Sequence, residues 1–269
     1  MVVLCCLRQF CFTPKSHFCG VYYFNLLVKL SFPLQFVPFF NFCLQLVVMA
    51  EIKFAVVGHS HVKRMKALLD SDPAILDSIE QAISQDRVKM TFVGAGGIKI
   101  NHLFSAFPSR LPPSKFSFFL KFREVLRFRP DALLLFLGDN DIRANTCPEE
   151  LACRLIALAS MVQKRFKIKH IIFSQVLPRH GVEHELYNEK AFLVNKFLAL
   201  FCKDHDGIFF QHCSFSFPGE KKNGRSKFLS FGKSKSFFLQ DGIHLSDSGY
   251  LRILKKIKNT VVQEATHAS

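Results

Sequence analysis

The chain has 269 residues, of which 49% are hydrophobic and 21% are charged, with 13 Gly and 11 Pro. This composition supplies enough apolar material for a sizeable core, and it excludes a disordered, collagen-like or mucin-like chain. Lys and Arg number 36 against 21 Asp and Glu, giving a formal net charge of +15, which favours acidic partners but carries no information about the fold.

The N-terminal segment 1–48 differs in composition from the rest of the chain. Residues 1–50 contain no acidic residue and five of the nine Cys residues. Three interpretations remain open: a gene-model artefact, a membrane anchor over residues 21–48, or a signal peptide. The apolar span exceeds the about 20 residues that cross a bilayer, but Lys29 and two prolines interrupt it. We expect a cytoplasmic protein, which is membrane-associated if the anchor is genuine.

Residues 49–269 are expected to form one domain, because short apolar runs there alternate with longer segments of helical periodicity. This alternation predicts βαβ units, and hence a mostly parallel five-stranded sheet with helices on both sides. The predicted elements, in chain order, are strand 53–57, helix 62–69, a helix from 72 to about 85, strand 88–93, strand 132–137, helix 149–166, strand 170–176, helix 185–202, strand 208–211 and helix 246–262.

Two segments rich in Ser, Lys and Phe, residues 114–122 and 219–238, do not fit this alternation. The second is a basic insertion with six Lys or Arg residues and one acid, Glu220. Basic residues interleaved with aromatic residues are typical of nucleic-acid binding. The alternatives are a solvated insertion or retained intron sequence.

Four short motifs place polar groups where ligands bind in parallel sheets, outside the carboxyl ends of the strands. Ser60 follows the first strand, Gly97 closes a glycine-rich turn after the second, and Asn140 follows the strand 132–137. Asp241 and His244 stand just before the final helix. We therefore expect these five residues to form one site.

These residue types suit nucleophilic catalysis on an ester. Histidine is the usual base for a serine hydroxyl, and Asp241, three residues before His244, is close enough to orient it. The Ser60 N–H, the Gly97 N–H and the Asn140 amide would donate to the negative oxygen of a tetrahedral intermediate.

In order and spacing, the motifs Gly58-His59-Ser60, Gly97, Gly138-Asp139-Asn140-Asp141 and Asp241-Gly242-Ile243-His244 resemble the four blocks of the SGNH (GDSL-like) hydrolase superfamily. The resemblance covers residues 53–262 and is nearest to SGNH-like domains of animal proteins.

This resemblance implies a flavodoxin-like three-layer α/β/α sandwich that hydrolyses a small-molecule carboxylic ester without a metal or organic cofactor. It also implies a nucleophile at Ser60, a base at His244, an acid at Asp241, and an oxyanion hole formed by Ser60, Gly97 and Asn140. The alternative is a catalytically degenerate, retroelement-derived binding module, which contacts nucleic acid or another acidic partner through the basic insertion.

The sequence departs from the family pattern at His59, where the family usually has Asp. Gly96 could also replace Gly97 as the oxyanion glycine. Elsewhere, His180 and His184 flank a predicted loop, and we expect both to face solvent. Arg179, in the same loop, could position an anionic substrate group.

Overall fold

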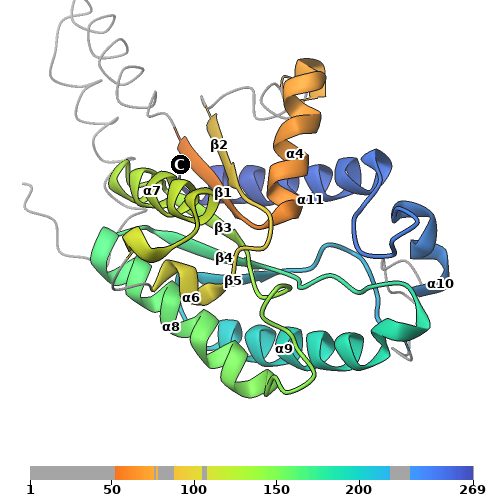
Figure 1. Ribbon diagram of the computed structural model, residues 1–269. Helices are drawn as coiled ribbons and strands as arrows, with labels where there is room; N and C mark the ends of the chain where they lie inside the picture. Colours follow the sequence, from red (N-terminus) through yellow and green to blue (C-terminus); the bar gives the residue numbers. More distant parts are fainter. Residues whose placement is uncertain (1–51, 76, 78–87, 105–107, 219–230, 269) are drawn as a thin grey trace, which may run out of the picture. The chain divides into compact units, whose positions relative to one another are not determined.

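Five parallel strands form the central sheet of the computed structural model, in the order β2-β1-β3-β4-β5 (Figure 1). The strands are β1 (Ile52–Gly58), β2 (Val88–Gly94), β3 (Ala132–Phe136), β4 (His170–Ser174) and β5 (Ile208–Gln211). All five lie where the sequence predicts a strand, and the parallel sheet confirms the predicted fold class. This strand order is the flavodoxin-like one, in which the order of the strands reverses between β1 and β3: β2 is added on one side of β1, and β3, β4 and β5 follow on the other.

The structure describes residues 52–75, 77, 88–104, 108–218 and 231–268, with side chains as far as residue 260. Three predicted features therefore lie outside the described residues: the N-terminal segment 1–48, the end of the helix predicted to begin at residue 72, and residues 219–230 of the basic insertion. Within the described ranges, no helix combines the length and the hydropathy that a bilayer-spanning helix needs.

Helices cover both faces of the sheet, with α4 and α11 on one face and α7, α8 and α9 on the other (Figure 1). The α-helices are α4 (Ser60–Ser71), α6 (Ile100–Leu103), α7 (Pro113–Arg127), α8 (Pro148–Phe166), α9 (Glu185–Lys203), α10 (Phe231–Ser234) and α11 (Asp247–Ala268). The described part of the chain also contains three short 3₁₀ helices, η2 (Pro108–Arg110), η3 (Val182–His184) and η4 (Lys235–Phe237).

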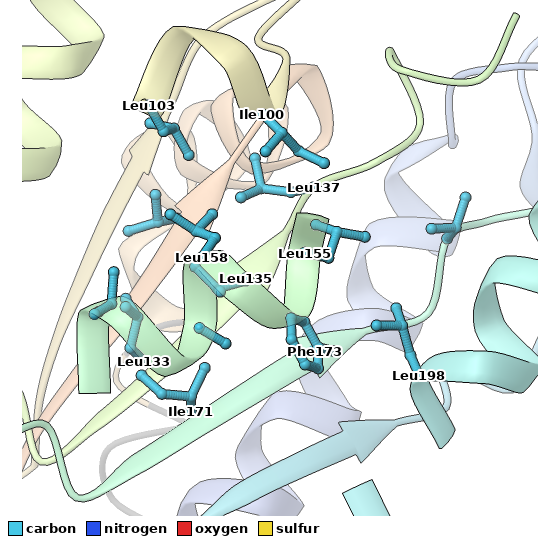
Figure 2. Close-up of a cluster of buried hydrophobic side chains, with 14 of the residues drawn as sticks. Ile100, Leu103, Leu133, Leu135, Leu137, Leu155, Leu158, Ile171, Phe173 and Leu198 are labelled. Carbon is cyan, nitrogen blue, oxygen red and sulfur yellow. The ribbon is translucent and has the colours of Figure 1, made fainter. Parts of the chain in front are cut away.

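The central strand β3 separates two hydrophobic clusters, because successive side chains of a strand point to opposite faces. Leu133 and Leu135 pack with the helices α7, α8 and α9 (Figure 2). Leu134 and Phe136 pack on the opposite face with α4 and α11. Every residue of this strand is buried, as expected for a continuous apolar run that helices cover on both sides.

The segment 114–122 belongs to the helix α7, so its interpretation as a solvated insertion is wrong. Phe118, Phe122 and Val125 are buried at helical spacing and pack in the same cluster as Leu133. Pro113 occupies the first helical position, where a missing N–H costs no hydrogen bond. The Ser and Lys residues between the Phe residues conceal this period in the sequence.

The close approach of β1 and β3 brings the functional ends of these strands together. Gly58 pairs with Phe136, and a Cβ atom at Gly58 would lie 2.3 Å from the Phe136 carbonyl oxygen. Only glycine permits this contact. Ser60 and Asn140, which follow the two strands, therefore emerge next to each other at the point where the strand order reverses. Ligands bind at this point in open α/β sheets.

Candidate active site

Ser60 is the first residue of α4, directly after the turn that leaves β1. The N–H groups of the first helical turn have no acceptor within the helix, and the helix dipole adds positive potential at this end. The preceding residue, His59, is buried and donates its backbone N–H to the Phe136 carbonyl at 3.2 Å. The turn therefore presents the partly exposed Ser60 at the carboxyl end of the sheet.

Asp241 and His244 form a hydrogen-bonded pair in the turn before α11. The Nδ1 atom of His244 lies 2.6 Å from Oδ2 of Asp241, while Oδ1 of Asp241 accepts the backbone N–H groups of Ile243 and His244, both at 2.9 Å. Partial burial acts to raise the pKa of Asp241, but the hydrogen bonds from His244 and Ile243 outweigh it and lower the pKa to about 2. The carboxylate is therefore ionised at neutral pH and orients the imidazole.

Gly242 allows this turn to pack against the rest of the domain. Its φ is +64°, and a Cβ atom at this position would lie 1.8 Å from the His180 carbonyl oxygen. In return, Gly242 accepts the His180 backbone N–H at 2.8 Å. The Asp241–His244 turn is thus held against the segment that follows β4.

A single pocket of about 350 Å³ collects residues from these separate turns. The nucleophile and base candidates, Ser60 and His244, both line it. So do Gly96, Gly97 and Asn140, which include both candidates for the oxyanion glycine. The predicted site residues are therefore brought together, with Asp241 behind His244.

Hydrogen bonds fix the side of the pocket that holds Gly97 and Asn140. The Asn140 amide donates to the Ile98 carbonyl at 3.0 Å, which leaves its second amide hydrogen free to donate elsewhere. Asp141 accepts the Ile100 N–H, joining the loop after β3 to the start of α6. Gly97 has a φ of +65°, a conformation that favours glycine.

Lys115 reaches the same side from α7. Its ammonium group donates to the Gly96 carbonyl, which belongs to the peptide unit that carries the Gly97 N–H. In a trans peptide these two groups point in opposite directions, so a cation on the carbonyl polarises the N–H as a donor. Nothing in the sequence of segment 114–122 indicates a helix beside the glycine turn, so the position of this lysine could not be predicted.

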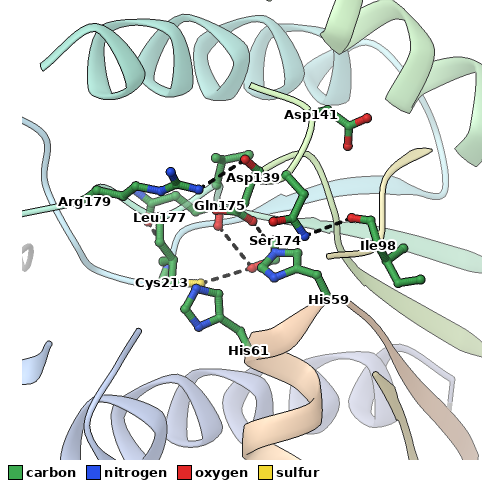
Figure 3. Close-up of polar contacts among 12 residues, drawn as sticks. His59, His61, Ile98, Asp139, Asp141, Ser174, Gln175, Leu177, Arg179 and Cys213 are labelled. Atoms are coloured by element: carbon green, nitrogen blue, oxygen red, sulfur yellow. Dashed lines mark hydrogen bonds and ion pairs between the residues drawn. The ribbon is translucent and has the colours of Figure 1, made fainter. Parts of the chain in front are cut away.

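His59, the departure from the family pattern, contacts Asp139 across the base of the pocket (Figure 3). Nε2 of His59 approaches Oδ2 of Asp139, and the Tyr187 hydroxyl donates to Oδ1 at 3.0 Å. Burial acts to raise the pKa of Asp139, but the neighbouring His59, His61 and Arg179 together hold it well below its usual range. This contact ties the serine turn to the loop that carries Asn140.

His61 occupies the space between His59 and His244. Its ring centroid lies 5.1 Å from that of His59 and 5.9 Å from that of His244, and its Nδ1 atom lies 3.0 Å from the Tyr250 hydroxyl. Burial, followed by the neighbouring His59, lowers the pKa of His61 to about 3. His61 is therefore neutral at ordinary pH and packs beside His244, the candidate catalytic base. Its hydrogen-bond partner Tyr250 lies in α11, and no pattern in the sequence indicates this contact.

The chain between β4 and η3 forms another side of the pocket, and α9 holds it in place. Asn195 bonds both backbone groups of Val176, at 2.9 Å each. Asn188 does the same for Arg179, accepting its N–H at 2.8 Å and donating to its carbonyl at 2.7 Å. Two buried amide side chains thus hold this segment in place through its backbone groups.

The prediction that His180 faces solvent is wrong. His180 is buried, stacks on Phe231 with the ring centroids 4.3 Å apart, and lies 3.0 Å from the Ser234 hydroxyl. His184 keeps a side chain only 15% exposed, in contact with Glu183. The part of the basic insertion that the structure describes, residues 231–238, therefore packs beside the candidate site.

Several solved structures have a fold similar to that of this chain. A member of the lipolytic G-D-S-L protein family from Veillonella parvula is similar with a TM-score of 0.52 and 12% identity, over 78% of this chain and 97% of that one. A carbohydrate esterase of family 3 from Talaromyces cellulolyticus gives 0.50 and 10% identity, over 81% and 100% of the two chains. A mutant acetyl esterase, crystallised with an acetate ion, gives 0.50 and 12% identity, with the same coverage.

No protein-family model matches the chain, and no curated protein matches its sequence. The structural similarity confirms the expected SGNH hydrolase fold, which esterases and lipolytic proteins share. Because the sequence identities are only 10% to 12%, the structural similarity shows the fold alone.

Proposed function

We propose that this protein is a serine esterase that cleaves a carboxylic ester with Ser60 as nucleophile, His244 as base and Asp241 as the acid that orients the base. One observation carries the proposal: Ser60, His244 and Asn140 come from three separate turns and line one pocket, while Asp241 bonds Nδ1 of His244. The catalytic domain would span residues 49–269.

In the first half of the reaction, Nε2 of His244 takes the proton of the Ser60 hydroxyl as its oxygen attacks the ester carbonyl carbon. The carbonyl oxygen becomes negative and accepts hydrogen bonds from the Ser60 N–H, the Gly97 N–H and the free amide hydrogen of Asn140. His244 then gives its proton to the leaving alcohol, and the acyl group stays on Ser60.

In the second half, water replaces the alcohol. His244 takes a proton from the water, the hydroxide attacks the acyl-serine, and the same three donors hold the second oxyanion. The proton returns to the Ser60 oxygen as the carboxylic acid leaves. Asp241 remains ionised throughout and stabilises each transient imidazolium through the bond to Nδ1.

A covalent probe tests the nucleophile without knowledge of the natural substrate. A fluorophosphonate reacts with activated serine residues and stays attached. We expect one mole of label per mole of folded full-length protein, located by mass spectrometry on the peptide that contains Ser60, and no label after heat denaturation. Label on a different residue, or none on the folded protein, would contradict the proposal and favour a non-catalytic binding module.

Asn140→Ala should lower kcat by about 10²- to 10³-fold with little change in KM, because the amide donates more strongly to the oxyanion than to the substrate carbonyl. The measurement is steady-state hydrolysis of p-nitrophenyl acetate. Asn145→Ala, on the exposed part of the same loop, is the matched control and should keep the wild-type kcat. A change confined to KM would instead assign Asn140 to ground-state binding.

A further inference from the structure

We infer that the substrate of the Ser60 pocket is an ester that also carries an anionic group, and that Arg179 binds this group. The inference rests on the proposed esterase function and adds the substrate class to it. Its basis is a positive charge that is built into the pocket and that forms no ion pair with an acid among the described residues.

Arg179 is held rigidly at the pocket rather than extended into solvent. Asn188 fixes its backbone through two hydrogen bonds, and its guanidinium carbon lies 3.8 Å from the centroid of the Tyr187 ring. A cation stacked on an aromatic face in this way loses little further freedom when it binds a ligand. The residue lines the same pocket as Ser60 and His244. Figure 3 shows its side chain reaching towards Asp139.

The guanidinium retains unused hydrogen-bonding capacity. It has five N–H donors, and the hydrogen bond that Nη2 donates to the Asp139 backbone carbonyl is a long one, 3.4 Å. None of the ion pairs between described residues includes Arg179. The carboxylate of Asp139 is already occupied by His59 and Tyr187. The charge on Arg179 acts on the Asp139 carboxylate from a distance, while its remaining N–H donors are available to a ligand.

The surroundings of the pocket extend this positive character. A second pocket of about 430 Å³ meets the first at Gly96 and is lined by Lys63, Lys121 and two serines. Lys115 stands at their common boundary, bonded to the Gly96 carbonyl. Asp139 is the only acid among the described residues that line either pocket. Such a surface attracts anions and raises their rate of encounter.

A carboxylate, a phosphate and a sulfate share the chemistry that this arginine recognises, since each offers two oxygens to a planar pair of N–H donors. A neutral ester cannot use these donors. We expect the charge-assisted contact to raise kcat/KM by about 10- to 100-fold for an anionic ester over its neutral counterpart.

Two pairs of synthetic esters test the inference on the full-length protein. In the first pair, 4-acetoxybenzoate and its methyl ester, the charge lies on the alcohol part. In the second, p-nitrophenyl hydrogen adipate and p-nitrophenyl methyl adipate, the charge lies on the acyl part. We expect an anionic preference in one pair, which locates Arg179 relative to the ester bond. In the wild type this preference should decline as salt is added, because salt screens the interaction.

Variants distinguish the effect of Arg179 on the anionic preference from the effect of the protein's overall positive charge. In Arg179→Gln the ratio of kcat/KM for the anionic and neutral esters should fall by about 10-fold or more, and in Arg179→Lys it should fall less. Arg165→Gln, which removes an exposed arginine that lies over Phe166 on α8, should leave the ratio unchanged. Equal rates within both pairs, or a preference that Arg179→Gln retains, would overturn the inference.

Failure of the proposed function gives a different result, namely no hydrolysis of any of the four esters. Binding of both ester pairs to the Ser60→Ala protein, measured by calorimetry, then decides the inference by itself. Tighter binding of the anion in one pair that is lost in the Ser60→Ala, Arg179→Gln double variant supports an anion site at Arg179. Equal binding of the two compounds within both pairs contradicts it.

Discussion

Ser60→Ala should reduce kcat/KM for p-nitrophenyl acetate by about 10⁴- to 10⁶-fold, because the reaction loses its nucleophile and retains only binding and the oxyanion donors. The fold should not change. Ser60 is partly exposed at the first position of α4, and replacement of one hydroxyl there removes no buried packing. The measurements are steady-state kinetics and the melting temperature of the same preparations.

Ser71→Ala is the matched control, since Ser71 ends the same helix and its hydroxyl bonds only the Leu68 carbonyl among the described residues. We expect wild-type kinetics from it. The double variant Ser60→Ala, His244→Ala should be no slower than Ser60→Ala alone, because a base without its nucleophile contributes nothing. Losses that multiply in the double variant, or substantial activity of Ser60→Ala, would remove Ser60 from the nucleophile position.

Asp241→Asn should lower kcat by about 10⁴-fold with the turn intact. The asparagine carbonyl can still accept the backbone N–H groups of Ile243 and His244, which now bond Oδ1. Its NH₂ group then faces Nδ1 of His244 and, as a donor, favours the imidazole tautomer that places the proton on Nε2. A histidine in that tautomer cannot take the Ser60 proton.

The pH dependence of kcat/KM distinguishes the role of Asp241 in fixing the His244 tautomer from an effect of its negative charge alone. The pKa of Asp241 is lowered to about 2, so the carboxylate is ionised throughout the range of about pH 5 to 9. Any fall of kcat/KM towards pH 5 in the wild type therefore does not come from protonation of Asp241. Because the folded-state pKa is the lower one, the contribution of Asp241 to the free energy of unfolding is present above about pH 4 and is lost as the pH falls towards 2.

We expect Asp241→Asn to remain slow at every pH in that range, since no pH restores the tautomer. Asp247→Asn, which neutralises an exposed acid at the start of α11, is the control and should keep the wild-type profile. If kcat/KM of the wild type does not vary with pH, or if Asp241→Asn matches it on the alkaline side, the Asp241–His244 assignment is wrong.

Local sequence patterns sufficed to predict the strands, their order along the chain and the candidate site residues that follow them. The run Ala132–Phe136 is apolar at every position, which is the local signature of a strand covered on both faces. Parallel strands bring their carboxyl ends to one edge, so Ser60 and Asn140 could be expected together before any contact was known. Asp241 and His244 are near each other in the sequence, and a turn suffices to pair them.

Tertiary structure alone decided which polar groups support that site. His61 and Tyr250 lie 189 positions apart, and His59 meets Asp139 across two strands. Arg179 owes its place to Asn188 in the following helix, and His180 is buried by Phe231 from the basic insertion. The residues in each of these contacts are not related by the spacing of a helix or a strand. Burial and hydrogen-bond partners of a side chain depend on which elements pack against it, and these neighbours are fixed only when the helices and the sheet pack together.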